Sequence, residues 1–265
     1  MKIETYKVDA FTEKLFAGNP AAVCILKDWI SDELMQNIAA ENNLSETAFV
    51  VPEKHSYQIR WFTPTVEVDL CGHATLASAF ILFEFFEKDK DSIDFYSPRS
   101  GELKVFKEGG KLFLDFPMDT LVMDKNFEEI EKAIGSIPLE IYKGKADYIA
   151  VLKGQKDIEK LEPNLPEISK LKARGLIVTA RGESVDFVSR FFGPQSGVDE
   201  DPVTGSAHTS LIPLWSKKLG KDALTAAQLS KRGGALECRN KGERCFIGGN
   251  VTLFLKGEIY TENEK

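Results

Sequence analysis

Short segments of the chain alternate between apolar and polar residues and are rich in β-branched and aromatic side chains. This alternation is typical of β-strands, because successive side chains of a strand point to opposite faces of the sheet. Gly109-Gly110 separates two of these segments and suits the turn of a hairpin. The predicted strands lie at 4–10, 21–26, 47–51, 57–62, 103–107, 111–116, 147–152, 175–180, 184–192, 235–239, 244–248 and 251–255.

Apolar residues recur at helical spacing in a smaller number of segments. Ser31 is a preferred N-cap residue, and Leu34, Met35 and Ile38 after it share one helical face. The apolar stripes are most simply the core-facing sides of helices. The predicted helices begin after Ser31, after Gly72 and after Gly205 with a stop at Gly220, and a shorter helix covers Phe127, Ile130 and Ile134.

The second half of the chain repeats short motifs of the first half in the same order. CGHAT at 71–75 is echoed by TGSAH at 204–208, and SPRSGEL at 97–103 by SKRGGAL at 230–236, both 133 positions later. IRWFTP at 59–64 resembles SRFFGP at 189–194 with a spacing of 130 positions, and Thr47-Ala48 matches Thr179-Ala180 with a spacing of 132 positions. The conserved order favours a duplication over coincidence.

The duplication predicts an α+β protein made of two similar domains related by pseudo-two-fold symmetry. Each domain is expected to be a bent, mostly antiparallel sheet around one central helix. The expected N-terminal domain covers 1–118, with a last strand at about 256–265 as a candidate addition. The expected C-terminal domain covers 119–255.

Composition and charge narrow the class of protein. The chain has 265 residues, 43% of them hydrophobic and 28% charged, which is typical of an ordinary globular protein and excludes a disordered one. The net charge of −7 disfavours partners such as nucleic acid and anionic membranes. No apolar run approaches the ~20 residues of a membrane span, and the first residues lack the apolar segment of a signal peptide. We therefore expect a cytoplasmic protein.

The cysteine and histidine content disfavours a disulfide framework and a metal site. Four scattered cysteines form no paired spacing. Cys71 and His73 supply two candidate zinc ligands, but the sequence shows no matching second pair. We therefore expect no metal.

The two glycine turns are candidates for binding an anion. Each turn follows a strand and opens a predicted helix, whose first backbone N–H groups have no partner within the helix. Together with the helix dipole, these groups attract negative charge. The alternative is that Gly72 and Gly205 only allow close packing. Two equivalent turns, followed by His73 and Ser206, favour a functional site that holds a carboxylate.

Four segments together resemble a known family. DAFTEKLFAGNPAAV at 9–23, NLSETAFV at 43–50, RWFTPTVEVDLCGHAT at 60–75 and FGPQSGVDEDPVTGSAH at 192–208 are similar to the signatures of the PhzF-like proteins, the phenazine-biosynthesis isomerase family. The resemblance extends along nearly the whole chain. It implies the diaminopimelate epimerase-like fold, a homodimer, no cofactor and a substrate cleft between two domains.

The resemblance also implies an activity and the residues that perform it. The family isomerises trans-2,3-dihydro-3-hydroxyanthranilate, moving a proton on a small carboxylated ring. The catalytic residues carried over by position are Glu46, His73, Asp201 and Ser206. We expect substrate contacts from Gly72, Ala74, Gly205 and Asn19.

The surroundings of these residues fit such roles, although each has a plainer alternative. Leu44 and Phe49 flank Glu46, and an apolar setting raises the pKa of a carboxyl group that takes and returns a proton. The alternative is a surface acid. His73 is expected to be a neutral donor because a helix N-terminus disfavours its cation; the alternative is a structural histidine.

The second half-site has alternatives as well. Ser206 caps its helix or binds the ligand. Asp201 accepts a bond from a substrate amine or hydroxyl, or orients His73, or is a solvated acid in an acidic run.

Two alternatives to a glutamate-dependent isomerase are considered. An epimerase with one thiol from each half is disfavoured, because Thr204 stands where a partner for Cys71 would be. Cys71 is then a small packing residue. A non-catalytic binder of small molecules remains open, because a fold does not fix a function. The favoured prediction is a cofactor-independent isomerase acting on a small carboxylated metabolite with an amino or hydroxyl group.

Overall fold

The chain forms two compact units. The computed structural model describes residues 1–262. Within these residues, the first unit contains Met1–Asp115 and 248–262, and the second contains Phe116–Ile247. The sequence predicts a change of domain at 118/119, a second domain that reaches residue 255, and a candidate last strand of the first domain at about 256–265, of which 263–265 lie outside the described residues. Residues from 248 belong to the first unit because the last strand, β18 (Val251–Tyr260), pairs along its length with β1 (Lys2–Ala10).

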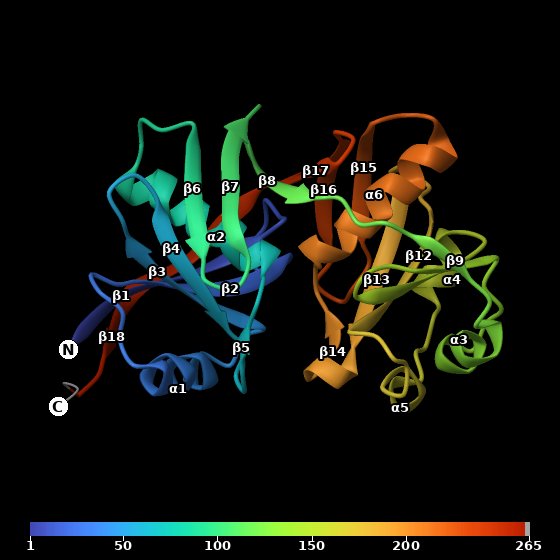
Figure 1. Ribbon diagram of the computed structural model, residues 1–265, viewed down its shortest axis with the longest axis horizontal. Coiled ribbons are helices and arrows are strands. Elements are labelled where there is room, and N and C mark those ends of the chain that lie inside the picture. Colours follow the sequence, from blue (N-terminus) through green and yellow to red (C-terminus); the bar gives the residue numbers. More distant parts are fainter. Residues whose placement is uncertain (263–265) are drawn as a thin grey trace. The chain divides into compact units, whose positions relative to one another are not determined.

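The strands of the first unit form a mixed sheet in the order β18–β1–β2–β3–β4–β6–β7–β8 (Figure 1). The pairs β2/β3 and β4/β6 are parallel and the others are antiparallel. The short β5 pairs with the end of β4. The remaining bounds are β2 Asn19–Ile25, β3 Glu46–Pro52, β4 Tyr57–Phe62, β5 Glu67–Val68, β6 Ser92–Ser97, β7 Gly101–Glu108 and β8 Lys111–Pro117.

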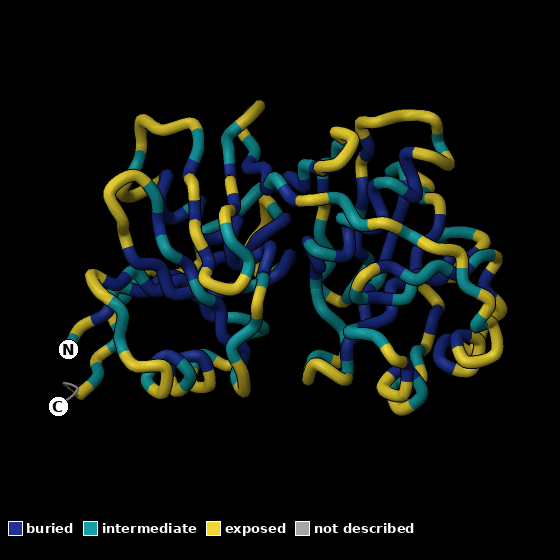
Figure 2. The backbone as a smooth tube through the Cα atoms, in the orientation of Figure 1, coloured by how far each residue is buried: buried dark blue, intermediate teal, exposed yellow. Residues whose placement is uncertain are grey.

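Two helices pack on the first unit's sheet. Helix α1 (Asp32–Asn42) begins at Ser31, whose hydroxyl accepts a bond from the Leu34 N–H at 3.2 Å, so the predicted N-cap is confirmed. Helix α2 (Gly72–Ile81) is buried along nearly all of its length, whereas α1 exposes one side (Figure 2). Because α2 contacts both β1–β3 and β7, the sheet bends around it. A π-helical turn, Leu82–Phe86, continues α2.

The second unit repeats this topology. Its strands follow the order β9–β10–β11–β12–β13, with β14 and β15 beside β13 and β16 beside β15. Again two pairs are parallel, β11/β12 and β13/β15. The strand bounds are β9 Val122–Asp124, β10 Glu140–Lys143, β11 Asp147–Val151, β12 Gly175–Arg181, β13 Phe187–Gly193, β14 Val198–Asp201, β15 Ala223–Gln228, β16 Gly234–Asn240 and β17 Arg244–Gly249.

Helix α6 (Gly205–Leu219) takes the place in the second unit that α2 takes in the first. It ends at Gly220, whose left-handed φ of 67° confirms the predicted stop. Pro213 inside α6 donates no hydrogen bond to the Thr209 carbonyl, which instead accepts the N–H of Asp119 at 3.2 Å. The smaller helices are α3 Phe127–Ile134, α4 Gln155–Glu159 and α5 Leu165–Ile168, and Pro194–Ser196 forms a 3₁₀ turn.

The duplicated motifs form equivalent ion pairs. Arg60 makes a two-bonded pair with Glu67 at 2.7 and 2.9 Å, and Arg190 makes the same pair with Glu200 at 2.7 and 3.0 Å. Each arginine also lies over the phenylalanine two residues later. The repeated motifs therefore correspond in three dimensions, and the predicted α+β, epimerase-like fold is confirmed. Within residues 1–262, no helix has the length and apolarity needed to cross a membrane.

Candidate active site

The first half-site gathers around His73, where β2, β3 and α2 begin. Gly18, in a left-handed conformation with φ of 65°, turns the chain into β2 and places Asn19 at its first position. Asn43 ends α1, also left-handed, three residues before Glu46 opens β3. Cys71 is the N-cap of α2. The starts of β2, β3 and α2, which are far apart in the sequence, therefore lie together around His73.

His73 contacts a different group at each ring nitrogen. Its Nε2 lies 3.3 Å from Oε2 of Glu46. Its Nδ1 lies 3.2 Å from the amide nitrogen of Asn19 and 3.4 Å from Sγ of Cys71. The His73 side chain is 5% exposed and that of Glu46 is 17% exposed, so water has limited access to the pair.

The contact with Asn19 sets the tautomer of His73. An amide nitrogen is only a donor, so with Asn19 placed this way Nδ1 accepts and the ring proton of neutral His73 lies on Nε2. Nε2–H then faces the Glu46 carboxylate. Asn19 is fully buried. The structure therefore places Asn19, predicted as a substrate contact, against His73.

Glu46, Cys71 and His73 also form a candidate metal-binding group. One ligand atom from each lies within 4.8 Å of the other two, and carboxylate, thiol and imidazole are zinc ligand types. The sequence had identified only Cys71 and His73. In the arrangement shown, Cys71 and Glu46 approach opposite nitrogens of the ring, so one ion bound to all three would have to replace one of these contacts.

Gly72 and Ala74 lie in the buried first turn of α2. The hydroxyl of Thr75 donates to the Cys71 carbonyl at 2.6 Å and ties this turn to its N-cap residue. Cys71 makes no side-chain capping bond. The first N–H groups of an α-helix have no acceptor inside the helix, so Gly72 and Ala74 offer donors at this position.

Asp201 is held at the entrance to the second turn. The Thr204 hydroxyl donates to its carboxylate at 2.5 Å. The buried Gln228 bridges the same loop: its amide donates to the Asp201 carbonyl and its oxygen accepts the Thr204 N–H, both at 2.8 Å. The Thr204 side chain makes no capping bond to α6. These bonds fix Asp201 next to Gly205.

Ser206 contacts a group that the sequence did not indicate. Nη1 of Arg174 donates to its Oγ at 2.8 Å. The same guanidinium forms a two-bonded pair with Asp147, with Nε at 3.0 Å from Oδ1 and Nη2 bonded to Oδ2. Asp201 and Ser206 are therefore held by separate sets of partners on either side of Gly205.

Arg174 was missed because the repeat alignment was shifted in this region. Arg60 pairs with Phe49 across the first sheet, and Arg190 pairs with Val178 across the second. Phe49 therefore corresponds to Val178, which is a spacing of 129 positions. With this spacing Glu46 corresponds to Gly175, whereas the spacing of 132 between Thr47 and Thr179 would match Glu46 with Val178. With this spacing, Arg174 stands directly before the position equivalent to Glu46.

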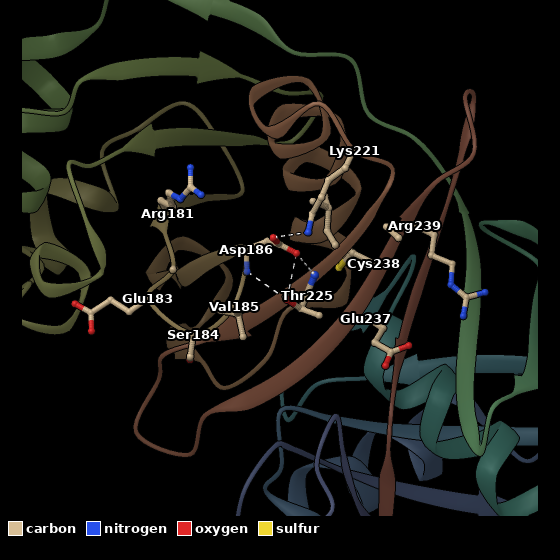
Figure 3. A pocket seen from close by; sticks show the side chains of 13 residues that line it. Arg181, Glu183, Ser184, Val185, Asp186, Lys221, Thr225, Glu237, Cys238 and Arg239 are labelled. Carbon is tan, nitrogen blue, oxygen red and sulfur yellow. Dashed lines mark hydrogen bonds and ion pairs between the residues drawn. The ribbon is translucent and has the colours of Figure 1, made fainter.

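A separate cavity of about 460 Å³ lies in the second unit, between residues 182–186 and strands β15 and β16 (Figure 3). Among the described residues that line it, none is a predicted site residue. Asp186 fills its middle and pairs with Lys221 at 2.6 Å. Burial opposes the ionisation of Asp186, but Lys221 and hydrogen bonds from Thr225 outweigh it and lower the pKa. These mutually neutralised groups define no ligand.

Comparison with known proteins identifies the family. A family profile for phenazine biosynthesis-like proteins matches residues 8–257. An uncharacterized isomerase of Pseudomonas aeruginosa is 49% identical over 259 residues, covering 98% of this chain and 99% of the relative. The crystal structure of a PhzF family protein from Enterococcus faecalis has a TM-score of 0.95 and 48% identity, covering 98% of this chain and 100% of that one.

A more distant structure shows how widely the fold is shared. A predicted epimerase from Pseudomonas aeruginosa is 16% identical with a TM-score of 0.76, covering 98% of this chain and 100% of the other. This likeness concerns the fold alone. The family profile and the two close relatives cover nearly the whole length, so the chain belongs to the phenazine biosynthesis-like (PhzF) family, whose relatives include proteins named as isomerases.

Proposed function

We propose that this protein is a cofactor-independent isomerase that moves a proton on a small carboxylated metabolite bearing an amino or hydroxyl group. The observation that carries the proposal is the Glu46–His73 contact at 3.3 Å, with the opposite nitrogen of His73 held by Asn19. A carboxylate beside a fixed neutral donor, with restricted access to water, suits a group that must both accept and return a proton.

Each proton transfer in this proposal uses one carboxylate. Glu46 takes a proton from a carbon of the substrate, and the electron pair of that C–H bond moves into the adjoining unsaturated system. The proton held by Glu46 exchanges with solvent, and protonated Glu46 then gives a proton to another carbon, so the substrate is isomerised and the enzyme is restored. The Nε2–H of His73 stabilises the Glu46 carboxylate before transfer and becomes available to the substrate after it.

The second half-site is proposed to hold other groups of the same substrate. In this proposal the backbone N–H groups at Gly205 and the hydroxyl of Ser206 bind the substrate carboxylate. Asp201 accepts a hydrogen bond from the amino or hydroxyl group. The bond from Thr204 supports this role because it orients the Asp201 carboxylate, and the bond from Gln228 to the Asp201 backbone carbonyl holds the same loop.

Hydrogen exchange in deuterated water tests the proposal without knowledge of the natural substrate. The protein is incubated with a panel of small unsaturated carboxylates, and deuterium on carbon is followed by NMR and mass spectrometry. We expect exchange with at least one panel member, and its loss in Glu46→Gln, which keeps the size of the side chain. Binding of a panel member without exchange would instead support a binding protein.

Glu41→Gln is a matched control for the charge change, because Glu41 is an exposed acid in the nearby helix α1. This variant is expected to exchange deuterium at the wild-type rate. Wild-type exchange in Glu46→Gln, with the fold intact, would refute the assignment of Glu46.

A further inference from the structure

Arg174 lies beside the second turn with its guanidinium fixed from several sides. It immediately precedes β12, and its N–H donates to the Ala146 carbonyl at 2.8 Å. Its guanidinium lies over the ring of Phe191, 5.2 Å from the ring centre. The following residue must be glycine here, because a Cβ on Gly175 would lie 2.5 Å from the Phe191 ring. The local sequence is therefore fitted to hold an arginine in this place.

Asp147 fixes the orientation of this guanidinium. The Asp147 side chain is only 4% exposed and accepts two bonds from Arg174. A two-bonded arginine–carboxylate pair restricts both distance and plane, so the remaining Nη1–H group has a defined direction. That group donates to Oγ of Ser206 at 2.8 Å. Asp147 thus acts on Ser206 through Arg174.

The bond from Arg174 restricts the hydroxyl proton of Ser206. Arginine is only a donor, so Oγ of Ser206 must be the acceptor. The hydroxyl proton then points away from the guanidinium and is available as a donor. The nearby Thr209 hydroxyl bonds to the Ser206 backbone carbonyl.

We propose that Arg174 is a positioning residue that presents the Ser206 hydroxyl as a donor to the carboxylate of the substrate, and thereby selects an anionic group over a neutral one. The inference rests on the proposed function, because it assigns the carboxylate to this half-site. It adds Asp147 and Arg174 to the residues that determine specificity. Asp147 neutralises the charge of Arg174, so selection depends on the oriented donor and the helix N-terminus.

A double-mutant cycle with a matched pair of ligands tests this inference. Wild type, Arg174→Met, Ser206→Ala and the double variant are titrated with 2-aminobenzoate, benzoate and acetate, and with 2-aminobenzamide as the neutral counterpart. The backbone amide signals of Gly205 and Ser206 in NMR report binding at the turn. Arg174→Met is expected to raise the Kd for the carboxylates about 10-fold, and the double variant no further than Ser206→Ala alone. The affinity for 2-aminobenzamide is expected to stay constant.

Arg190→Met is the matched control, because Arg190 forms the same kind of pair with Glu200 over a phenylalanine ring. It is expected to lower stability and to leave the ratio of carboxylate to amide affinity unchanged. If Arg174→Met does not fold, Arg174→Lys replaces it, since lysine keeps the charge but not the two-bonded geometry. Arg174→Lys is also expected to weaken carboxylate binding.

Three results would overturn the inference. The first is the absence of any shift at Gly205 and Ser206 in wild type with every carboxylate. The second is equal weakening of carboxylate and amide binding in Arg174→Met. The third is a further loss when Arg174→Met is added to Ser206→Ala, which would mean that Arg174 acts on the anion by a route other than Ser206. Because the readout is binding, a protein that shows the coupling but no deuterium exchange would support this inference and refute the isomerase.

Discussion

The first turns of α2 and α6 occupy equivalent places in two copies of one topology, yet an acidic side chain faces one turn and an arginine faces the other. At α2 the start of the neighbouring strand supplies Glu46, whose carboxylate faces His73. At α6 the residue just before the equivalent strand is Arg174, whose guanidinium faces Ser206. A duplicated scaffold has thus placed a carboxylate beside one helix N-terminus and a guanidinium beside the other.

The difference separates framework residues from chemical ones. The pairs Arg60–Glu67 and Arg190–Glu200 are the same in both units and support the sheets. The side chains that face His73 and Ser206, the second residues of α2 and α6, differ in the two units. In the proposed function, one half handles the proton and the other holds the anion.

Another pair of equivalent residues has the same structural role in both units but differs in its response to pH. Thr75 and His208 stand 133 positions apart, and each donates to the carbonyl of its helix's N-cap residue, at 2.6 and 2.9 Å. Thr75 does not titrate, whereas burial lowers the pKa of His208 to about 4, with only partial opposition from its bond to the Thr204 carbonyl. The same bond therefore depends on pH in the second unit.

The largest effect is expected when His73 of α2 is replaced by serine, the residue at the equivalent position of α6. His73→Ser removes the donor that faces Glu46 and is expected to slow deuterium exchange roughly 10²–10³-fold, the usual effect of removing one donor that stabilises a developing charge. The rate is measured by NMR in deuterated water, and circular dichroism checks the fold. Unchanged exchange in a folded variant would show that His73 is only structural.

The next effect is the pH dependence contributed by His208. Above pH 6.5 the residue is neutral in both folded and unfolded chains. Between pH 6.5 and about 4 the unfolded chain takes up a proton that the buried ring does not, so stability falls with falling pH, by about 3 kcal/mol in total. Urea unfolding at several pH values measures this change.

His208→Thr gives α6 the residue of α2 and is expected to remove this contribution to the pH slope, although it lowers stability at pH 7 by leaving a small cavity. His208→Gln, which is closer in size, controls for the cavity. A slope that is the same in all three proteins would contradict the role of His208.

A smaller effect is expected from breaking the equivalent ion pairs. Glu67→Gln and Glu200→Gln each weaken a two-bonded arginine pair and are expected to lower the free energy of unfolding by roughly 1–3 kcal/mol. Glu67 also pairs with Arg99 at 2.8 Å, so its replacement should cost more than that of Glu200. Chemical denaturation compares the two variants, and the reverse order would show that the pairs are not equivalent supports.

The smallest effect is expected from Cys71→Ala. The thiol is buried and 3.4 Å from His73, a weak contact at a nitrogen that Asn19 also bonds. Exchange activity should stay within about threefold of wild type, since thiols are weak hydrogen-bonding groups. A loss of 100-fold or more in a folded protein would revive thiol chemistry and, with it, the likeness to epimerases in mechanism as well as fold.

The sequence predicted the helices and turns better than the irregular strands. Ser31 and Gly220 act locally, as a cap and a left-handed stop, and both are confirmed. The hairpin at Gly109-Gly110 is confirmed by positive φ at both residues. Strand β15, with the sequence ALTAAQ, was not predicted because alanine favours helices; it is a strand because it pairs with β13 and β16.

The sequence likewise predicted some residues of the candidate site and missed others. Glu46 and His73 do lie together, and Asn19 lies with them, but against the ring of His73. Nothing in the local sequence marks Arg174, Asp147 or Gln228, because their roles depend on contacts 24 or more positions away in the chain. Such contacts require the register of the sheets.

The sequence by itself determined the duplication, the family and the two helix starts, because glycine turns, caps and repeated motifs act through neighbouring residues and backbone geometry. Tertiary structure decided which side chain meets each helix start. A shift of three positions in the repeat alignment separates Val178 from Gly175 as the counterpart of Glu46, and only strand pairing fixes that choice. The register of the second sheet is therefore what brings Arg174 to Ser206, as the register of the first brings Glu46 to His73.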